Sequence, residues 1–311
     1  KICVVGDILL DKYVQGTCSR ISPEAPVQII DHKNSIYLLG GAANVAKNIK
    51  SLECNVILCG FVGDDYYSEK IIKLLNKYGI EHCLIKISKQ KTLLKERIVV
   101  SGKQVLRVDY GDFYNSKGYQ KVFFDHCRNH ILNSDLLLIS DYSKGTVFDS
   151  QSLIKLARDN CLKSIVDPKS KNIKDYSGAY LIKPNLNEIK NYLLDAKENE
   201  YEIMIRKLCE DNSIEYILNT LGNKGMKLYT KDGILLETKS EAKSVYDVTG
   251  AGDTVVASIA ISLLEGVGII EAIKKSNRAA AIAVSKFGTQ SVTRSELDSK
   301  LYDNEIKFFN S

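Results

Sequence analysis

Short apolar runs of strand length alternate with helical patterns along most of this 311-residue sequence. The runs are continuously apolar, which is typical of strands buried on both faces of a parallel sheet. The expected strands lie at 2–5, 56–61, 136–140, 164–166 and 216–219, and the expected helices at 42–52, 66–78, 150–159 and 185–194. This order predicts an α/β fold with a doubly wound, mostly parallel sheet and helices on both faces.

Two segments interrupt this alternation with patterns of antiparallel strands. They cover residues 27–39 and 93–110, and the second has turn residues at 101–103. We therefore expect inserted strands near 12–39 and 91–110 to form a small separate sheet. Such a sheet could serve as a substrate lid, as a dimer surface, or as both.

The length of 311 residues allows one large α/β domain or two smaller ones, and since no linker divides the chain we expect a single domain over 1–311. Lys and Arg number 43 against 38 Asp and Glu, and the net charge of +5 is too dispersed to indicate nucleic-acid binding. The sequence has no run of about 18 apolar residues to span a membrane, no signal peptide at its start and no Pro-, Gly- or Ser-rich linker. We expect a cytoplasmic protein with no membrane or nucleic-acid partner, ending in a helix over 296–309.

The eight cysteines contain no C-x-x-C pair, and most lie in apolar runs. This pattern favours buried thiols in a reducing compartment over disulfides. His126 and His130 have the i, i+4 spacing of a metal-binding pair. Since no acidic residue stands between them as in a zinc protease, a surface helix face is the better interpretation.

The segment DVTGAGDT carries the strongest sign of chemistry. A strand-like approach over 243–246 leads toward Gly250-Ala251-Gly252, and an apolar helix follows. N–H groups at the start of a helix lack partners within it, so such a turn can bind an anion. Asp253, in the first helical turn, adds the proton acceptor that phosphoryl transfer to an alcohol needs. The alternative is an ordinary glycine turn before a packed helix.

A second glycine segment and two aspartates lie in the first part of the chain. Gly40 and Gly41 open a helix, so that a ligand can approach the backbone closely, and Asn44 can donate to and accept from a sugar hydroxyl. Asp7 and Asp11 flank the end of the first strand and could hold several hydroxyls of a polyol. Helix–strand packing for the glycines and capping for the aspartates are the alternatives.

Two short segments in the second half could bind a nucleotide. Asn185 and Glu188 lie on one face of an expected helix, and their oxygens can bind hydrated Mg²⁺ near nucleotide phosphates. Thr220, Gly222 and Gly225 follow a strand and could place a hydroxyl and amides against phosphate oxygens. A capping arrangement and a hairpin turn are the respective alternatives. No P-loop or dinucleotide fingerprint is present.

Together these segments resemble the ribokinase-like (PfkB) family of carbohydrate kinases. GGAANVAKNIKSL resembles the N-terminal signature of the family, DVTGAGDT its C-terminal signature, NLNE its N-x-x-E element and TLGNKG its phosphate loop. All four occur in the family order, so the resemblance spans residues 1 to about 295. VVGDILLDKYVQGTCSRISPEAPVQII further resembles the kinase domain of the D-glycero-β-D-manno-heptose-7-phosphate kinases. Those enzymes are often bifunctional, with a C-terminal adenylyltransferase domain that would begin near where this chain stops.

The resemblance implies a role for each residue singled out. Asp253 would be the base acting on the anomeric hydroxyl, beside an anion hole formed by Gly250, Ala251 and Gly252. The substrate would be held by Asp7, Asp11, Gly40, Gly41, Asn44, Asp141, Arg107 and Lys169. ATP would contact Asn185, Thr220, Gly222, Gly225 and Asn277. Asn185 and Glu188 would organise Mg²⁺ through water, and K⁺ would lie near Asp247 and Thr249.

The distal phosphate of such a substrate needs cations to bind it. An Arg fork or a Lys point charge suits a phosphate. The candidates are Lys95, Arg97 and Arg107 on the inserted strands, with Lys144 and Lys169 after core strands. Charges on solvated strand faces are the alternative interpretation of this set.

The implied reaction is the ATP-dependent phosphorylation of D-glycero-D-manno-heptose 7-phosphate at O1. Its product would be heptose 1,7-bisphosphate, a precursor of ADP-heptose for the lipopolysaccharide core. The edges of the inserted strands also lead us to expect a homodimer. Two alternatives stay open: a kinase of another sugar or of a nucleoside on the same scaffold, and a catalytically silent sugar- or nucleotide-binding regulator.

Overall fold

A computed structural model describes residues 1–193, 197–242, 244–286 and 288–299 of the chain. Its main sheet has nine strands, and neighbouring strands from β5 to β11 run parallel, while β12 and β13 are added antiparallel at one edge. In spatial order the strands are β13 (Gly233–Thr238), β12 (Met226–Thr230), β11 (Tyr216–Thr220), β10 (Leu181–Ile182), β9 (Lys163–Asp167), β8 (Leu136–Ser140), β1 (Ile2–Gly6), β4 (Val56–Gly63) and β5 (Glu81–Ile87).

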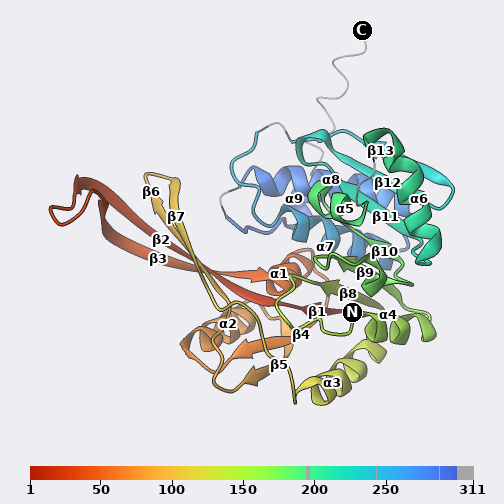
Figure 1. Ribbon diagram of the computed structural model, residues 1–311, viewed down its shortest axis with the longest axis horizontal. Coiled ribbons are helices and arrows are strands. Elements are labelled where there is room, and N and C mark those ends of the chain that lie inside the picture. Colours follow the sequence, from red (N-terminus) through yellow and green to blue (C-terminus); the bar gives the residue numbers. More distant parts are fainter. Residues whose placement is uncertain (194–196, 243, 287, 300–311) are drawn as a thin grey trace, which may run out of the picture.

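Helices cover both faces of this sheet (Figure 1). A separate hydrophobic cluster lies on each face. One face is covered by α1 (Ala42–Ser51), α2 (Tyr66–Lys77), α7 (Ala251–Leu264) and α8 (Ile269–Val284). The other face is covered by α3 (Gln120–Leu132), α4 (Ser150–Asp159), α5 (Leu186–Tyr192) and α6 (Tyr201–Asp211). The remaining helices are short: α9 (Arg294–Asp298), η1 (Ile173–Tyr176), η2 (Glu198–Glu200) and η3 (Gly222–Lys224).

Strand β1 shows why the apolar runs are continuous. Ile2 and Val4 pack into the cluster under α1 and α7, whereas Cys3 and Val5 pack into the cluster under α3 and α4. Side chains alternate between the faces of a strand, so a strand covered on both sides needs apolar residues at every position. The predicted α/β class with helices on both faces is confirmed.

A second sheet projects from the body as a long arm (Figure 1). Its order is β3-β2-β6-β7, with β2 (Ile8–Ile21), β3 (Gln28–Gly41), β6 (Leu94–Val100) and β7 (Lys103–Tyr110). β2 and β3 form an antiparallel hairpin that is buried at its base and exposed at its far end. The small separate sheet is therefore present, and β2 begins at Ile8, earlier than the expected start near residue 12.

The structure differs from the sequence predictions near the C-terminal third. Residues 244–246 form no strand, and Lys243 lies outside the described residues, as does the end of the helix expected over 185–194. Of the helix expected over 296–309, the structure describes only the part up to residue 299, where α9 ends at Asp298, and the rest lies outside the described residues. Across the described ranges, every helix is too short or too polar to cross a membrane.

Candidate active site

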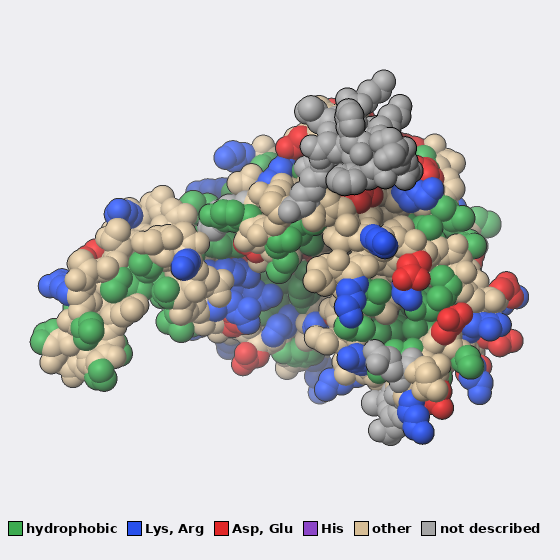
Figure 2. All heavy atoms as spheres, turned by 90° about the horizontal axis from the view of Figure 1, so that it is seen from above, with side chains coloured by type: hydrophobic (Ala, Val, Ile, Leu, Met, Phe, Trp, Pro, Cys, Tyr) green, Lys and Arg blue, Asp and Glu red, His purple; other side chains and the backbone are tan. Residues whose placement is uncertain are grey.

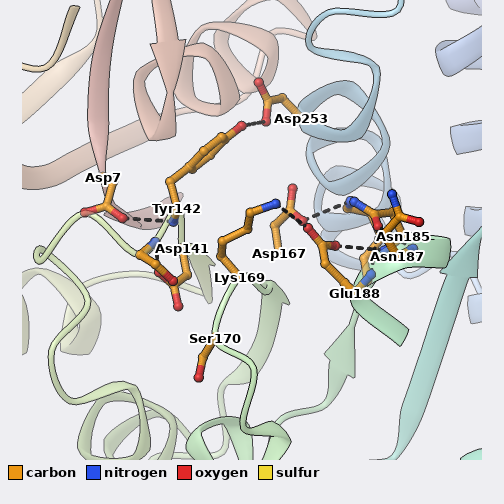
Figure 3. A network of polar contacts seen from close by, with 12 residues as sticks. Asp7, Asp141, Tyr142, Asp167, Lys169, Ser170, Asn185, Asn187, Glu188 and Asp253 are labelled. Carbon is orange, nitrogen blue, oxygen red and sulfur yellow. Dashed lines mark hydrogen bonds and ion pairs between the residues drawn. The ribbon is translucent and has the colours of Figure 1, made fainter. Parts of the chain in front are cut away.

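Polar residues that follow β1, β8, β9 and β10 gather on one side of the main sheet, next to the start of α7 (Figure 3). The carboxyl ends of parallel strands share one edge of a sheet, and ligands of such folds bind there. Asp7, Tyr142 and Asp253 come from three separate parts of the chain and lie side by side at this edge (Figure 3).

Asp253 lies in the first turn of α7 and is 4% exposed. Its Oδ1 accepts a hydrogen bond from the Tyr142 hydroxyl at 3.0 Å (Figure 3). Its Oδ2 accepts one from Asn44 Nδ2 at 2.6 Å. Burial raises the pKa of Asp253 to about 7, with a further upward contribution from the charge of Asp167 and downward ones from the two donors. A carboxyl group with a pKa near neutrality is well placed to exchange a proton with a substrate hydroxyl.

The glycine turn lies directly before Asp253. Gly250 is the N-cap of α7 with φ of 81°, a left-handed conformation that favours glycine. A Cβ atom at Gly250 would stand 2.8 Å from Asn44 Nδ2, and one at Gly252 would stand 3.1 Å from Lys183 Nζ. The turn is thus packed tightly against Asn44 and Lys183, with the N-terminal end of α7 available to an anion.

Lys183 was not singled out by the sequence analysis. It follows β10, is 4% exposed, and its Nζ lies 2.9 Å from Asp167 Oδ1. Desolvation lowers the pKa of Lys183, but the attraction of Asp167 outweighs it, and the net shift of the pKa is upward. The ammonium group therefore stays charged beside the turn. The one signal in the sequence is its place directly after the apolar pair Leu181-Ile182, and that alone does not show that the side chain reaches the turn.

Asp7 binds the backbone of another loop. Its carboxylate accepts hydrogen bonds from the N–H groups of Tyr142 at 2.8 Å, Lys144 at 2.9 Å and Thr146 at 2.9 Å, and the side chain is completely buried. The geometry therefore gives Asp7 a role in shaping the loop after β8. A direct contact of Asp7 with a sugar stays a prediction.

Asp11 and Arg97 form a buried ion pair at the base of the arm. The Arg97 guanidinium also lies 5.3 Å from the centre of the Tyr13 ring. A Cβ atom at Gly40 would stand 2.6 Å from Asp11 Oδ2, so the backbone of β3 approaches this carboxylate closely, next to the α1 N-cap Gly41. The charge of Arg97 is thus engaged by Asp11, and its predicted contact with a phosphate stays untested.

Asp141 turns away from Asp253. Its carboxylate accepts hydrogen bonds from the Tyr176 hydroxyl at 2.5 Å and from the backbone of Ser143 at 2.7 Å. Burial raises the pKa of Asp141. These contacts anchor the loop after β8 to η1, and the predicted role of Asp141 in substrate binding stays a prediction.

Asn185 and Glu188 form a capping box at the start of α5. Asn185 Oδ1 accepts from the backbone of Asn187 at 2.9 Å and of Glu188 at 3.0 Å, and Glu188 Oε2 accepts from the backbone of Asn185 at 2.9 Å. Lys169 Nζ lies 3.0 Å from Glu188 Oε1 (Figure 3). The capping interpretation is confirmed, and the remaining lone pairs of these oxygens can still bind the water shell of Mg²⁺.

The loop with Thr220, Gly222 and Gly225 joins the antiparallel strands β11 and β12, so the hairpin interpretation is also confirmed. Thr220 forms a bridge with Asn185, which places this loop next to the capping box. A Cβ atom at Gly225, whose φ is 96°, would stand 1.9 Å from Thr238 O. Any other residue at Gly225 would therefore displace the strand β13.

Two further candidates, Asn277 and Asp247, form hydrogen bonds to backbone segments. Asn277 Nδ2 donates to Lys239 O at 2.7 Å. Asp247 accepts from the backbone N–H of Thr249 at 2.8 Å and of Gly288 at 3.1 Å. No group of three or more His, Cys, Asp or Glu side chains able to hold a metal occurs in the described part of the chain, and K⁺ near Asp247 and Thr249 stays a prediction.

The cationic candidates differ in what they contact. Lys and Arg side chains gather where the arm joins the body (Figure 2). Lys95 Nζ lies 5.5 Å from the centre of the Tyr142 ring, and burial lowers the pKa of Lys95. Lys144 Nζ instead donates to Asp112 O at 2.9 Å, and Arg107 pairs with Asp109 at 2.9 Å. Of these three, Lys95 is the one directed at the residue that contacts Asp253.

Residues 1–296 match the model of the pfkB family carbohydrate kinases. The chain belongs to this family. It is 39% identical over 306 residues to "Bifunctional protein HldE" of Coxiella burnetii strain Dugway 5J108-111, with 97% of this chain and 64% of that protein covered. It is 36% identical over 311 residues to the HldE protein of Actinobacillus succinogenes, with 99% and 65% covered. The chain thus spans less than two thirds of the length of these relatives.

Solved structures of pfkB relatives share the fold. Arabidopsis thaliana ribokinase in complex with ribose and ATP matches with a TM-score of 0.76 at 19% identity, covering 95% of this chain and 96% of that one. Phosphofructokinase-2 of Escherichia coli, in complex with substrates and products, matches with a TM-score of 0.77 at 18% identity, covering 97% and 98%. The predicted ribokinase-like fold is confirmed, and family membership identifies the chain as a carbohydrate kinase.

Proposed function

We propose that this carbohydrate kinase transfers the γ-phosphoryl group of MgATP to O1 of a heptose 7-phosphate and so produces a heptose 1,7-bisphosphate. The observation that carries the proposal is the position of Asp253 between Asn44 and Tyr142, directly after the glycine turn. The heptose as substrate is supported by the segment with SRISPEAPV and by the likeness to the HldE proteins. The proposal concerns the kinase reaction alone, and an adenylyltransferase half stays a prediction.

The acceptor hydroxyl would bind against Asp253 and give up its proton to that carboxylate as the new bond to phosphorus forms. Asn44 holds the carboxylate through Nδ2, while its Oδ1 is buried and has no hydrogen-bond partner among the described residues. A buried acceptor without a donor is costly. A second hydroxyl of the sugar would remove this cost by donating to Asn44 Oδ1, which would orient the ring over Asp253.

The transferring phosphoryl group would bind at the glycine turn. Phosphoryl transfer depends on positioning and on donors aimed at the moving charge. The N–H groups of the first turn of α7, which no side chain caps, and the Lys183 ammonium would provide such donors. MgATP is the second substrate, and Asn185 and Glu188 would contact its metal through water, while Thr220 and Gly222 would face its phosphates.

The distal phosphate of the sugar would bind to Lys95. This ammonium group comes from β6 of the arm, lies over Tyr142, and is half-buried. Desolvation strengthens the attraction of a cation for a phosphate, since the local dielectric constant is lower. The arm would therefore act as a lid whose charge recognises a phosphorylated sugar.

The arm also supports a homodimer. The arm exposes several large apolar side chains along its length: Ile21, Val27, Ile36, Val105, Leu106 and Tyr110. Exposed apolar patches with free strand edges favour association. We expect Leu106→Glu to convert a dimer to a monomer in light scattering, while Ile203→Glu on α6 leaves the mass unchanged. A wild-type monomer at micromolar concentration would contradict the dimer.

A substrate panel tests the reaction. ADP release is measured with heptose 7-phosphate, the unphosphorylated heptose, ribose, fructose 6-phosphate and a nucleoside, and the product position is determined by phosphorus NMR. The highest kcat/KM is expected for heptose 7-phosphate, with a new signal at C1. A higher value for an unphosphorylated sugar or a nucleoside would favour the alternative kinase, and calorimetric binding without turnover would favour a regulator.

The eight free thiols support the predicted cytoplasmic location.

A further inference from the structure

Four thiols and two imidazoles meet between the edge of the main sheet and helix α3, outside the candidate active site. The thiol of Cys59 on β4 interacts with the thiols of Cys3, Cys83 and Cys127. Cys83 lies on β5, the edge strand, and is partly exposed, whereas Cys59 is buried. The complete cluster comprises Cys3, Cys59, Cys83, Cys127, His126 and His130.

Cys59 and Cys83 are direct neighbours in the sheet. The two residues are paired in register on the parallel strands β4 and β5, so both side chains point to the same face. Neighbouring strands are about 4.8 Å apart, and disulfides join Cα atoms that are roughly 4.4–6.8 Å apart. The pairing of the strands therefore already places the Cα atoms of these two cysteines within the range that a disulfide spans.

The surroundings of the two thiols shift their pKa values in opposite directions. Cys83 Sγ lies 3.6 Å from His126 Nδ1, and His130 faces the same thiol one helical turn further along α3. The hydrogen bond from Cys59, followed by the contributions of His130 and His126, lowers the pKa of Cys83 to about 5, although burial opposes this shift. The contact with Cys127 lowers the pKa of Cys59, but the contacts with Cys3 and Cys83, together with burial, outweigh it and raise that pKa well above the usual value. The groups that face Cys83 thus favour a thiolate there and a thiol at Cys59.

We propose that Cys83 is a peroxide-reactive thiol and that Cys59 is its resolving partner. The Cys83 thiolate attacks one oxygen of hydrogen peroxide, the O–O bond breaks, hydroxide leaves, and Cys83 becomes a sulfenic acid. The Cys59 sulfur then attacks the Cys83 sulfur, and the sulfenic oxygen leaves as water together with the proton of Cys59. Two thiols have lost two electrons, and the peroxide has accepted them.

Thiol labelling of the whole chain tests the first step. The reduced protein is treated briefly with iodoacetamide at pH 6.5, and the rate at each cysteine is determined by peptide mass spectrometry. We expect Cys83 to react at least threefold faster than Cys161, which is more exposed but belongs to no thiol cluster. The ratio of the alkylation rate at Cys83 to that at Cys161 should fall when His126 and His130 are both replaced by Gln. Equal or slower alkylation of Cys83 would overturn the proposal.

Peroxide treatment tests the second step. One equivalent of hydrogen peroxide should yield a peptide pair joined through Cys59 and Cys83. With Cys59→Ser the same treatment should leave a sulfenic acid at Cys83 that dimedone traps, and Cys161→Ser should behave as the wild type. A disulfide between Cys59 and Cys127, or no oxidation of Cys83, would overturn the assignment. Wild-type measurements suffice if a variant fails to fold.

Discussion

Tyr142 joins two regions that hold a buried carboxylate in opposite ways. Its backbone N–H donates to Asp7, together with the N–H groups of Lys144 and Thr146, whereas its hydroxyl donates to Asp253, together with the side chain of Asn44. Asp7 is 0% exposed and Asp253 is 4% exposed, so burial does not distinguish them. The two carboxylates differ in their hydrogen-bond donors. The backbone amides that donate to Asp7 are fixed by the fold, whereas the side chains that donate to Asp253 can move when a substrate hydroxyl arrives.

This comparison separates a carboxylate that shapes a loop from one that performs chemistry. Asp7 connects the end of β1 to residues 142–146 after β8, and losing it removes three hydrogen bonds at once. Asp253 has a pKa near 7, since burial and Asp167 oppose its charge. A variant at Asp7 should therefore affect stability, and a variant at Asp253 should affect turnover.

The largest expected effect is on turnover in Asp253→Asn. Loss of a single oxyanion donor costs roughly 3 kcal/mol, and the acceptor of the proton should matter at least as much. We expect kcat to fall about a thousandfold or more, which corresponds to about 4 kcal/mol. Steady-state assays of ADP release measure this, and calorimetry should show that MgATP still binds. Near-normal turnover would show that Asp253 is not the base and would contradict the difference in role between Asp253 and Asp7.

Asp7→Ala should lower the stability of the protein rather than act directly on turnover. Hydrogen bonds to a charged group contribute about 1.5–3 kcal/mol each, and partial compensation by water leaves an expected loss of roughly 3 kcal/mol in the free energy of unfolding. Urea denaturation measures this loss. Asp109→Ala, which removes an exposed carboxylate paired with Arg107, is the control and should cost less than 1 kcal/mol. Unchanged stability of Asp7→Ala together with abolished turnover would show that Asp7 acts on the substrate.

The pH dependence follows from the raised pKa of Asp253. The base must be ionised, so kcat/KM should fall about tenfold per pH unit below roughly pH 7. A carboxyl with a raised pKa also loses its contribution to stability as pH rises from its unfolded pKa through the folded one. Asp253→Asn should therefore be more stable than wild type at pH 8, with the advantage disappearing near pH 4. Initial rates from pH 5 to 9 and unfolding curves from pH 4 to 9 would test both, and a flat rate profile would contradict the assignment.

Lys95→Met should raise the KM for a phosphorylated sugar without changing the KM for ATP. Removal of a partly desolvated cation from a phosphate costs about 2 kcal/mol, or roughly thirtyfold in KM. Arg107→Met is the matched control on the next strand, because its charge is exposed and paired with Asp109. If Lys95→Met leaves the KM of heptose 7-phosphate unchanged, the arm does not recognise the distal phosphate.

The glycine turn, Asp253 and Asn44 could be predicted from the sequence because their requirements are local. A helix start with small residues and a first-turn carboxylate is readable in DVTGAGDT. Tyr142 and Lys183 could not be identified, since their positions depend on how β8 and β10 align with α7 in the sheet. The role of Asp7 was open for the same reason, because its three partners come from residues 142–146.

The sequence left the roles of Asn185 and Glu188 open for a different reason, which is chemical. A capping box and a water-bridged metal site use the same oxygen-bearing side chains at the same spacing. The structure confirms the cap and leaves the metal contact as a prediction. Arg97 shows a further limit, because only the fold reveals its ion pair with Asp11, which lies opposite Lys95 on the neighbouring strand β2.

Tyr142→Phe gives the smallest effect and the sharpest test of the comparison. The hydroxyl donates to Asp253 and lowers its pKa, while the backbone N–H that donates to Asp7 remains in the variant. Loss of one hydrogen bond costs about 1 kcal/mol, so kcat should fall roughly fivefold. The acidic limb of the rate profile should also move to higher pH, because the ionised carboxylate has lost a donor. Tyr119→Phe, whose hydroxyl lies near Ser88, should change neither quantity. If Tyr142→Phe lowers stability but does not shift the acidic limb of the rate profile, Tyr142 only supports the fold.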